Sequence, residues 1–165
     1  MSIPNAKFLT LNSYFLTPNS SSMFIGEYQA TIDEKGRISI PAKFRTQLNS
    51  TVVVTRGLDN SLFLYNLDEW QKLAEKLSSL PISSANTRAF SRLMLAGAMD
   101  CEVDKQGRIG LPPYLKEFAQ INKKIIFAGL YNRIEVWSDE LWTTYKNQTE
   151  KESNAIAEQL GSLGV

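Results

Sequence analysis

Two stretches of the chain share one pattern of hydrophobic and polar positions. They are residues 26–32 (GEYQATI) and residues 97–103 (GAMDCEV), and alternate positions in both are apolar or small. These positions are Tyr28, Ala30 and Ile32 in the first stretch, and Met99, Cys101 and Val103 in the second. Most of the intervening positions are polar, and a period of two predicts a half-buried strand in each stretch.

A nearly identical segment comes after each predicted strand. It reads DEKGRISIP at residues 33–41 and DKQGRIGLP at residues 104–112, so the offset is 71 residues. After one inserted residue, residues 52–70 align with residues 124–142 in the same way. Each copy therefore predicts strand, tight turn, strand, short helical turn, strand, turn, strand and helix. A copy of about 45 residues is too short to bury its own apolar face, so we expect two copies to pack face to face and close one small barrel.

A helix is predicted after each copy, and another between the copies. The first covers residues 66–77, with Asn66 as its N-cap and Glu69 three residues later, which is a capping-box pattern. The linking helix covers residues 87–96, and the last helix begins near Ser138.

The apolar stripes of the first two helices are bulky. We expect Phe90, Leu93 and Met94 to face inward. One edge of a barrel would not cover the whole set, so we also expect these helices to pack against neighbouring subunits. The set is Trp70, Leu73, Phe90 and Met94.

Composition excludes several kinds of function. The chain has 165 residues, an apolar share of 43%, a net charge of +1, no histidine and one cysteine, Cys101. Without histidine, the usual general base, zinc ligand and Ser-His-Asp arrangement are missing. A lone cysteine forms neither an internal disulfide nor a thiolate metal cluster, and Cys101 is predicted to be a small buried hydrophobe. We therefore expect no enzyme, no metal and no cofactor, in a reducing, cytoplasmic setting. No small-molecule ligand is evident, and no apolar run approaches the roughly 20 residues that cross a membrane.

The two turns have a structural interpretation. Asp33 and Asp104 can each accept hydrogen bonds from backbone N–H groups just ahead of them, and Gly36 and Gly107 can supply the positive φ that such a turn requires. Arg37 can fold back on Asp33 as an exposed ion pair.

Charge gives the turns a second interpretation. The window from residue 35 to 58 holds five basic residues and no acidic one, whereas the matching window of the second copy contains Glu117 and comes after Asp100, Glu102 and Asp104. Cations on rigid hairpin tips suit phosphate contacts, and a β-ribbon can enter a DNA groove, where Arg reads guanine. We expect Arg37 to be the main DNA contact and Arg108 a weaker one. The full set of predicted DNA contacts is Lys35, Arg37, Lys43, Arg45, Lys105 and Arg108.

Five motifs together resemble the MraZ family of bacterial transcriptional regulators. The resemblance runs from Met23 to about Trp142, and the two copies are similar to the swapped-hairpin domain of the SpoVT/AbrB superfamily. The family's D-x-x-x-R element falls on Asp33 and Arg37, and again on Asp104 and Arg108. The motifs are MFIGEY, DEKGRISIPAKFR, RAFSRLMLAGA, DKQGRIGLPPYLKEFA and GLYNRIEVW.

The resemblance implies both a fold and a function. The fold class is α+β, mainly β: a double swapped-hairpin β-barrel from two AbrB-like repeats, with flanking helices. The implied function is sequence-specific binding to double-stranded DNA, at direct repeats in the promoter of the protein's own division and cell-wall gene cluster, generally with repression. A nucleoid-associated homo-oligomeric ring, often octameric, is also implied.

The predicted organisation is built on the two copies. It consists of a flexible N-terminal extension over residues 1–22, a first SpoVT/AbrB-like domain over 27–69, a helical linker over 70–97, a second SpoVT/AbrB-like domain over 98–141, and a C-terminal helix or tail over 142–165. The extension has no counterpart in the family, which favours Met23 as a native start.

Two other functions stay open on the sequence. AbrB-like folds also occur in antitoxins, and an interaction module of that kind predicts a disordered C-terminal tail that wraps a partner. The polar composition of residues 143–165 is compatible with such a tail. An enzyme would have to use carboxylates, Lys, Tyr or Ser, and no pair of these stands at a spacing that indicates a site.

Overall fold

The order of elements repeats along the chain. The computed structural model describes residues 23–164, and the expected flexible extension over residues 1–22 lies outside them. The first repeat forms β1 (Phe24–Thr31), β2 (Arg37–Ser39), α1 (Ala42–Arg45), β3 (Thr51–Arg56), β4 (Leu62–Asn66) and α2 (Leu67–Ser78). The connection holds α3 (Ala85–Ser91) and a π-helical turn, η1 (Arg92–Ala96). The second repeat forms β5 (Met99–Glu102), β6 (Arg108–Gly110), α4 (Pro113–Phe118), β7 (Lys124–Tyr131), β8 (Ile134–Ser138), α5 (Asp139–Leu160) and a final turn, η2 (Gly161–Leu163). The order of strands and helices predicted for both copies is confirmed.

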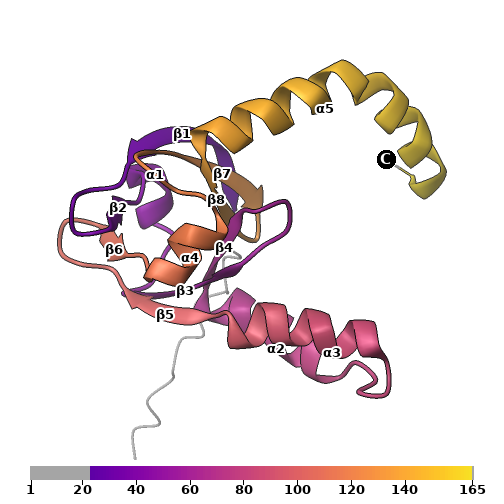
Figure 1. Ribbon diagram of the computed structural model, residues 1–165, viewed down its shortest axis with the longest axis horizontal. Helices are drawn as coiled ribbons and strands as arrows, with labels where there is room; N and C mark the ends of the chain where they lie inside the picture. The colour runs from indigo at the N-terminus through magenta and orange to yellow at the C-terminus, as the bar shows by residue number, and fades with distance from the viewer. Residues whose placement is uncertain (1–22, 165) are drawn as a thin grey trace, which may run out of the picture.

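The strands of the two repeats are interleaved in one antiparallel sheet of order β1-β7-β8-β4-β3-β5. β1 of the first repeat pairs with β7 of the second over its whole length, and β5 of the second repeat pairs with β3 of the first. β4 and β8 join the two halves at the centre. Each repeat thus completes its sheet with a strand of the other, which agrees with the expectation that one copy cannot bury its own apolar face (Figure 1).

A second, two-stranded sheet is also shared between the repeats. β2 and β6 pair antiparallel with Ile38 opposite Ile109, and both isoleucines are buried. We call this pair the β2–β6 ribbon. The fold is therefore α+β with mostly antiparallel strands and helices α1 to α5, as predicted. Among residues 23–164, β1 and β5 are the edges of the large sheet and do not pair, so a closed barrel is not confirmed.

One hydrophobic core draws on both repeats. Phe24 and Phe44 of the first repeat are fully buried with Ile125 and Phe127 of the second. Cys101 lies in the same core, as predicted, and burial raises the pKa of its thiol to about 11. The expectation that Met99 faces inward is wrong, because β5 is an edge strand and Met99 at its start is 40% exposed.

The predicted capping box of α2 is wrong in detail. Asn66 is the N-cap residue, but its side chain makes no capping hydrogen bond. Its Nδ2 donates to the Gln47 carbonyl at 2.7 Å, and its Oδ1 accepts from the Asn49 N–H at 3.3 Å. Glu69 instead accepts from Lys72 at 2.6 Å. Tertiary contacts to the loop before β3 have replaced the local cap.

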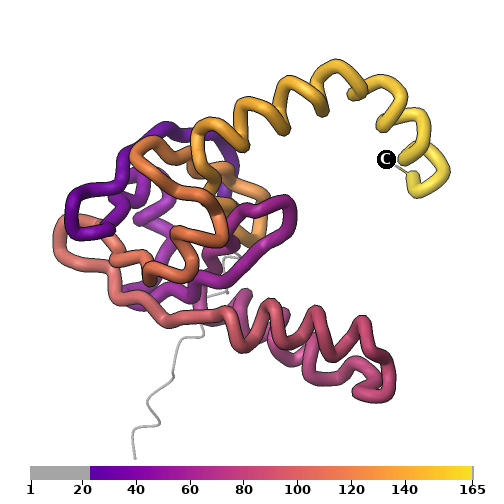
Figure 2. Tube along the Cα trace, in the orientation of Figure 1, coloured from indigo at the N-terminus to yellow at the C-terminus, as the bar shows by residue number. Residues whose placement is uncertain are grey.

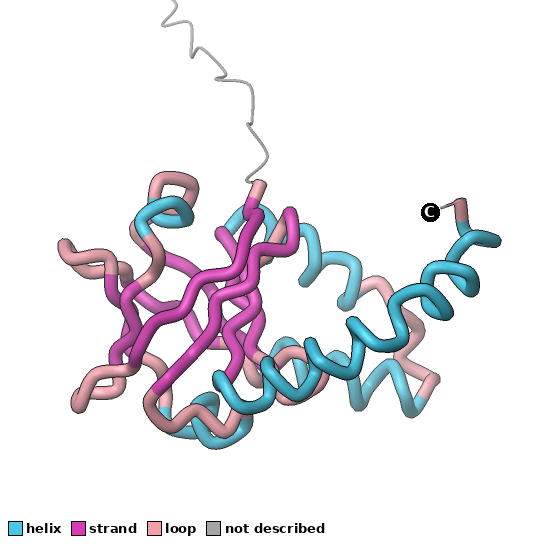
Figure 3. Tube along the Cα trace, turned by 90° about the horizontal axis from the view of Figure 1, so that it is seen from above, coloured by secondary structure: helices cyan, strands magenta, loops and turns pink. Residues whose placement is uncertain are grey.

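Two helical arms extend from the same side of the strand core (Figures 1 and 3). In the first arm, α2 and α3 lie side by side (Figure 2). Met94 of η1 is buried there against Phe63 and Tyr65 of β4, whereas Phe90 is 38% exposed. The inward prediction is thus confirmed for Met94 and wrong for Phe90. The linking helix also begins earlier than predicted, where Ser84 caps α3.

The second arm is α5, which begins at the predicted place. Ser138 caps it by accepting a hydrogen bond from the Leu141 N–H at 3.3 Å. Trp142 and Tyr145 in its first turns pack on Trp137, and no residue of the helix is buried. None of the helices in residues 23–164 is long and apolar enough to cross a membrane.

Candidate nucleic-acid interface

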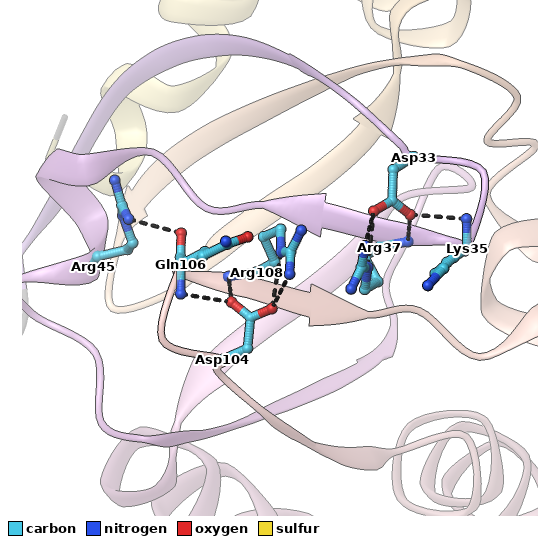
Figure 4. A network of polar contacts seen from close by, with 7 residues as sticks. All are labelled: Asp33, Lys35, Arg37, Arg45, Asp104, Gln106 and Arg108. Atoms are coloured by element: carbon cyan, nitrogen blue, oxygen red, sulfur yellow. Dashed lines mark hydrogen bonds and ion pairs between the residues drawn. The ribbon is translucent and has the colours of Figure 1, made fainter.

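The first Asp–Gly–Arg turn is held by its own aspartate. Asp33 Oδ1 accepts from the backbone N–H groups of Lys35 at 3.0 Å and Arg37 at 2.9 Å. Its Oδ2 accepts from Arg37 Nε at 2.8 Å and from Nη2 at 2.7 Å (Figure 4). The Arg37 guanidinium beside Asp33 holds the pKa of that carboxyl below its usual range. Gly36 has φ +75°, a conformation that glycine adopts without steric cost.

The second turn repeats this geometry. Asp104 Oδ1 accepts from the N–H groups of Gln106 at 2.9 Å and Arg108 at 3.0 Å, and its Oδ2 accepts from Arg108 Nε at 2.8 Å and Nη2 at 2.7 Å. Hydrogen bonding from Arg108 lowers the pKa of Asp104 to about 2. Gly107 has φ +76°. The structural interpretation of all four turn-forming residues therefore agrees with the geometry.

Both arginines lie on one face of the β2–β6 ribbon. Residues alternate across a strand, and Ile38 and Ile109 occupy the buried face. Arg37 lies opposite Gly110, and Ser39 lies opposite Arg108, so these four residues share the outer face. The two turns stand at opposite ends of the ribbon (Figure 4). The arginine side chains are 32% and 25% exposed.

Each turn also receives a cation from the other repeat. Arg45 of α1 donates from Nη1 to the Gln106 carbonyl at 3.0 Å (Figure 4). It lies so close over Gly107 that a Cβ at that position would be 2.1 Å from Arg45 Cδ. Lys116 of α4 holds the matching place, since a Cβ at Gly36 would be 3.4 Å from its Nζ.

This exchange changes the number of basic residues at each turn from the number that the sequence windows give. Arg45 is near the first turn along the chain, but in the structure it lies at the second. Each turn therefore gathers three basic side chains from the two repeats. They are Lys35, Arg37 and Lys116 at the first turn, and Lys105, Arg108 and Arg45 at the second. The two turns therefore have equal numbers of basic residues, and the stronger role expected for Arg37 stays a prediction.

Two other basic residues differ in their placement. Lys43 is exposed on α1. Arg56, which belongs to the same basic window of the sequence, lies over the rings of Tyr114 and Phe118 at 5.3 and 5.8 Å. The Arg56 guanidinium therefore makes cation–π contacts with the second repeat and does not lie at either turn.

Sequence reasoning did not select Lys116, Ser39 or Gly110. Lys116 could have been found because it stands 71 residues after Arg45, the offset that relates the two turns. Ser39 and Gly110 match each other at the same offset, and each stands two residues after the arginine of its own strand. The pairing of the two strands, which places both beside both arginines, cannot be read from the sequence. Among residues 23–164, no group of three His, Cys, Asp or Glu side chains could hold a metal ion.

Comparison with known proteins agrees with the two-repeat organisation. A family model described as "MraZ protein, putative antitoxin-like" matches the chain twice, at residues 23–93 and 94–161. The chain is 50% identical over 143 residues, 87% of its length, to proteins named "Transcriptional regulator MraZ". These come from Caldanaerobacter subterraneus subsp. tengcongensis, Thermoanaerobacter pseudethanolicus and Halothermothrix orenii, and each is covered over 100% of its length.

Proposed function

The chain belongs to the MraZ family, and from that premise we propose that it is a transcriptional regulator that binds double-stranded DNA. Its target would be direct repeats in the promoter of its own division and cell-wall gene cluster, and its effect would be repression. Such a protein acts at the nucleoid, in the cytoplasm. The relatives that are named as transcriptional regulators support the regulatory role.

The paired turns at the two ends of the β2–β6 ribbon carry the proposal of DNA binding. Each fixes an arginine with an aspartate and surrounds it with further cations. The ion pair uses Nε and Nη2 of each guanidinium, and Nη1 is not part of it. A guanidinium already held in one orientation loses little conformational freedom on binding a phosphate or a guanine edge. We propose Lys35, Arg37, Arg45, Lys105 and Arg108 as contacts, with Lys43 at the periphery.

The architecture that we propose for the strand core is the swapped-hairpin barrel of the SpoVT/AbrB superfamily. The exchange of β1 and β5 between the repeats supports it. The proposed boundaries are residues 27–69 and 98–141 for the two domains, with residues 70–97 as the linker.

We further propose that the protein assembles into a homo-oligomeric ring, octameric in the manner of the family. Exposed apolar side chains on both arms support an assembly; they are Ile82, Phe90, Ile156 and Leu160. Several copies of the ribbon held together would bind repeated DNA sites more tightly than one copy. Light scattering measures the assembly, and promoters with one to four repeats measure its consequence. A monomer that binds one repeat as tightly as four would contradict the ring.

The antitoxin-like description of the family model favours one alternative, an interaction module. That alternative predicts a disordered tail after Trp142. Residues 139–160 instead form one continuous helix, α5. An exposed helix can still bind a partner, so purification of the protein with its bound partners separates this alternative from DNA binding.

A gel-shift titration tests the proposed function. The probe is duplex DNA from upstream of the protein's own gene, and a duplex of scrambled sequence is the control. We expect tighter binding to the upstream DNA, and a footprint with repeated protected segments. Equal affinity for the two duplexes would contradict sequence-specific regulation.

A further inference from the structure

Two of the four residues on the ribbon's outer face are small. They are Ser39 and Gly110, and each lies directly opposite the arginine of the other strand. Among the described residues, and apart from Gly110 itself and its two chain neighbours, no heavy atom lies within 4 Å of the position that a Cβ at Gly110 would take. The backbone there does not need glycine either, because Gly110 is not among the positive-φ glycines. Packing and backbone geometry therefore give no reason for a glycine at this place.

Glycine inside a strand weakens it, and one common reason for its presence is the close approach of a ligand or another backbone. Here the residue lies on an open surface between two arginines. Ser39, the matching residue of the other strand, is also small. Each arginine thus has small residues beside it on the outer face, which allows a duplex to approach the ribbon backbone.

The dimensions of the ribbon suit one duplex. Two strands lie about 4.8 Å apart, and a major groove is about 12 Å wide, so a two-stranded ribbon can enter it. Arg37 and Arg108 are diagonal neighbours across the ribbon, a separation of about 7–8 Å between such positions. That span covers only about two base pairs, so both arginines would reach the same DNA segment.

Backbone hydrogen bonds also join each turn, at its end of the ribbon, to the other repeat. The Leu111 N–H donates to the Gly36 carbonyl at 3.0 Å, and the Ile40 N–H donates to the Gly107 carbonyl at 2.9 Å. Together with the placement of Arg45 and Lys116, these bonds mean that residues of both repeats form the surroundings of each turn.

We propose that the outer face of the β2–β6 ribbon binds DNA as one continuous surface. Ser39 and Gly110 lie directly against the duplex, and Arg45 and Lys116 supply phosphate contacts at the turn of the opposite repeat. This inference rests on the proposed function of DNA binding. It replaces a picture of two independent hairpin tips with a single site, and it adds Lys116, Ser39 and Gly110 to the interface.

A bulky side chain on the outer face, beside Arg37, tests the continuous surface. Fluorescence anisotropy with duplex DNA from upstream of the gene compares Gly110→Tyr with the unmodified chain at one salt concentration. Steric exclusion of the duplex should weaken binding at least about tenfold. Gly110→Ala should change it by less than about threefold, because a methyl group has room. Gly161→Tyr is the matched control, since Gly161 in the α5 arm is equally open and far along the chain from the ribbon.

Ser39→Tyr provides the second variant if Gly110→Tyr does not fold, as judged by circular dichroism. If either Gly110→Tyr or Ser39→Tyr is folded and binds DNA as tightly as the unmodified chain, the proposal of a continuous surface is overturned. If Arg37→Ala loses binding in the same series, the proposed function still stands. Failure of the unmodified chain to bind this DNA overturns both the function and the inference.

The phosphate contacts assigned to Arg45 and Lys116 are tested by the dependence of DNA affinity on salt concentration. Removing one phosphate contact lowers the slope of log K against log salt by about 0.9. We expect this loss for Lys116→Ala and for Arg45→Ala, and no change for Lys151→Ala in the exposed part of α5. If the slope is unchanged in both Lys116→Ala and Arg45→Ala, these two residues do not contact phosphate and the role assigned to them is overturned.

Discussion

The two repeats are nearly identical at their turns and differ most in the helices attached to their last strands. The Asp33 and Asp104 turns have the same hydrogen bonds, the same ion pair and almost the same glycine φ. After the last strand of each repeat the similarity ends. The first repeat continues into α2, α3 and η1, which fold back and bury Met94, whereas the second continues into α5, which buries none of its residues. The half of each repeat that would contact DNA is thus kept symmetric, and the half that extends outward is not.

The difference between the arms should produce the largest effect on stability. Met94→Ala removes a side chain that is 2% exposed between β4 and α2, and we expect a loss of about 2–5 kcal/mol in the free energy of unfolding. Ile156→Ala on α5 should change it by less than about 0.5 kcal/mol. Urea denaturation of both variants measures the difference. Equal losses would mean that α5 is as well packed in solution as the first arm.

The likeness of the turns should appear in DNA binding. Because each turn gathers three cations, Arg37→Ala and Arg108→Ala should each weaken binding by about 10–100-fold, or about 1.4–2.8 kcal/mol, and should differ by less than about threefold. This outcome differs from the stronger role for Arg37 that the sequence indicates. Titrations at fixed salt decide between them, with Lys151→Ala as a control. If only Arg37→Ala loses DNA affinity, Arg37 is the main contact, as the sequence indicates.

A small difference between the turns concerns their glycines. Alanine at Gly36 or Gly107 must adopt a left-handed conformation, which costs about 1–2 kcal/mol. Alanine at Gly107 must also displace Arg45, whose Cδ would be 2.1 Å away, whereas Gly36 has only the flexible end of Lys116 at 3.4 Å. We therefore expect the Gly107→Ala variant to be the less stable of the two. Thermal unfolding checks the order, and the reverse order would contradict the placement of Arg45.

The smallest expected effect is on acid stability. The pKa of Asp104 is about 2 in the folded protein, below its usual value of 3.8. A lowered pKa stabilises the fold above the usual value, and this contribution is lost as pH falls from about 4 to about 2. Asp104→Asn should therefore lose less stability than the unmodified chain over this interval. Melting temperatures at pH 5 and pH 2 test this, and identical drops in both proteins would contradict it.

Local patterns predicted much of the fold correctly. The period of two at residues 26–32 predicts β1, and the capping Ser138 marks the start of α5, because strand alternation and helix capping depend on neighbours along the chain. The repeat itself indicated that two copies share one core. Asp33, Gly36 and Arg37 were identified as a turn for the same reason, since their hydrogen bonds join residues at most four positions apart.

Tertiary structure decided which residues meet across the repeats. Asn66 abandons the predicted capping box because its amide bonds to the loop before β3, and Met99 is exposed because β5 lies at a sheet edge. Arg45 lies at the second turn because the antiparallel pairing of β2 and β6 places each short helix beside the other repeat's turn. Pairing of strands that are 71 residues apart in the chain cannot be deduced from either strand alone. The sequence by itself therefore determined the turns and their charges, and only the interleaving of the repeats combined them into one surface.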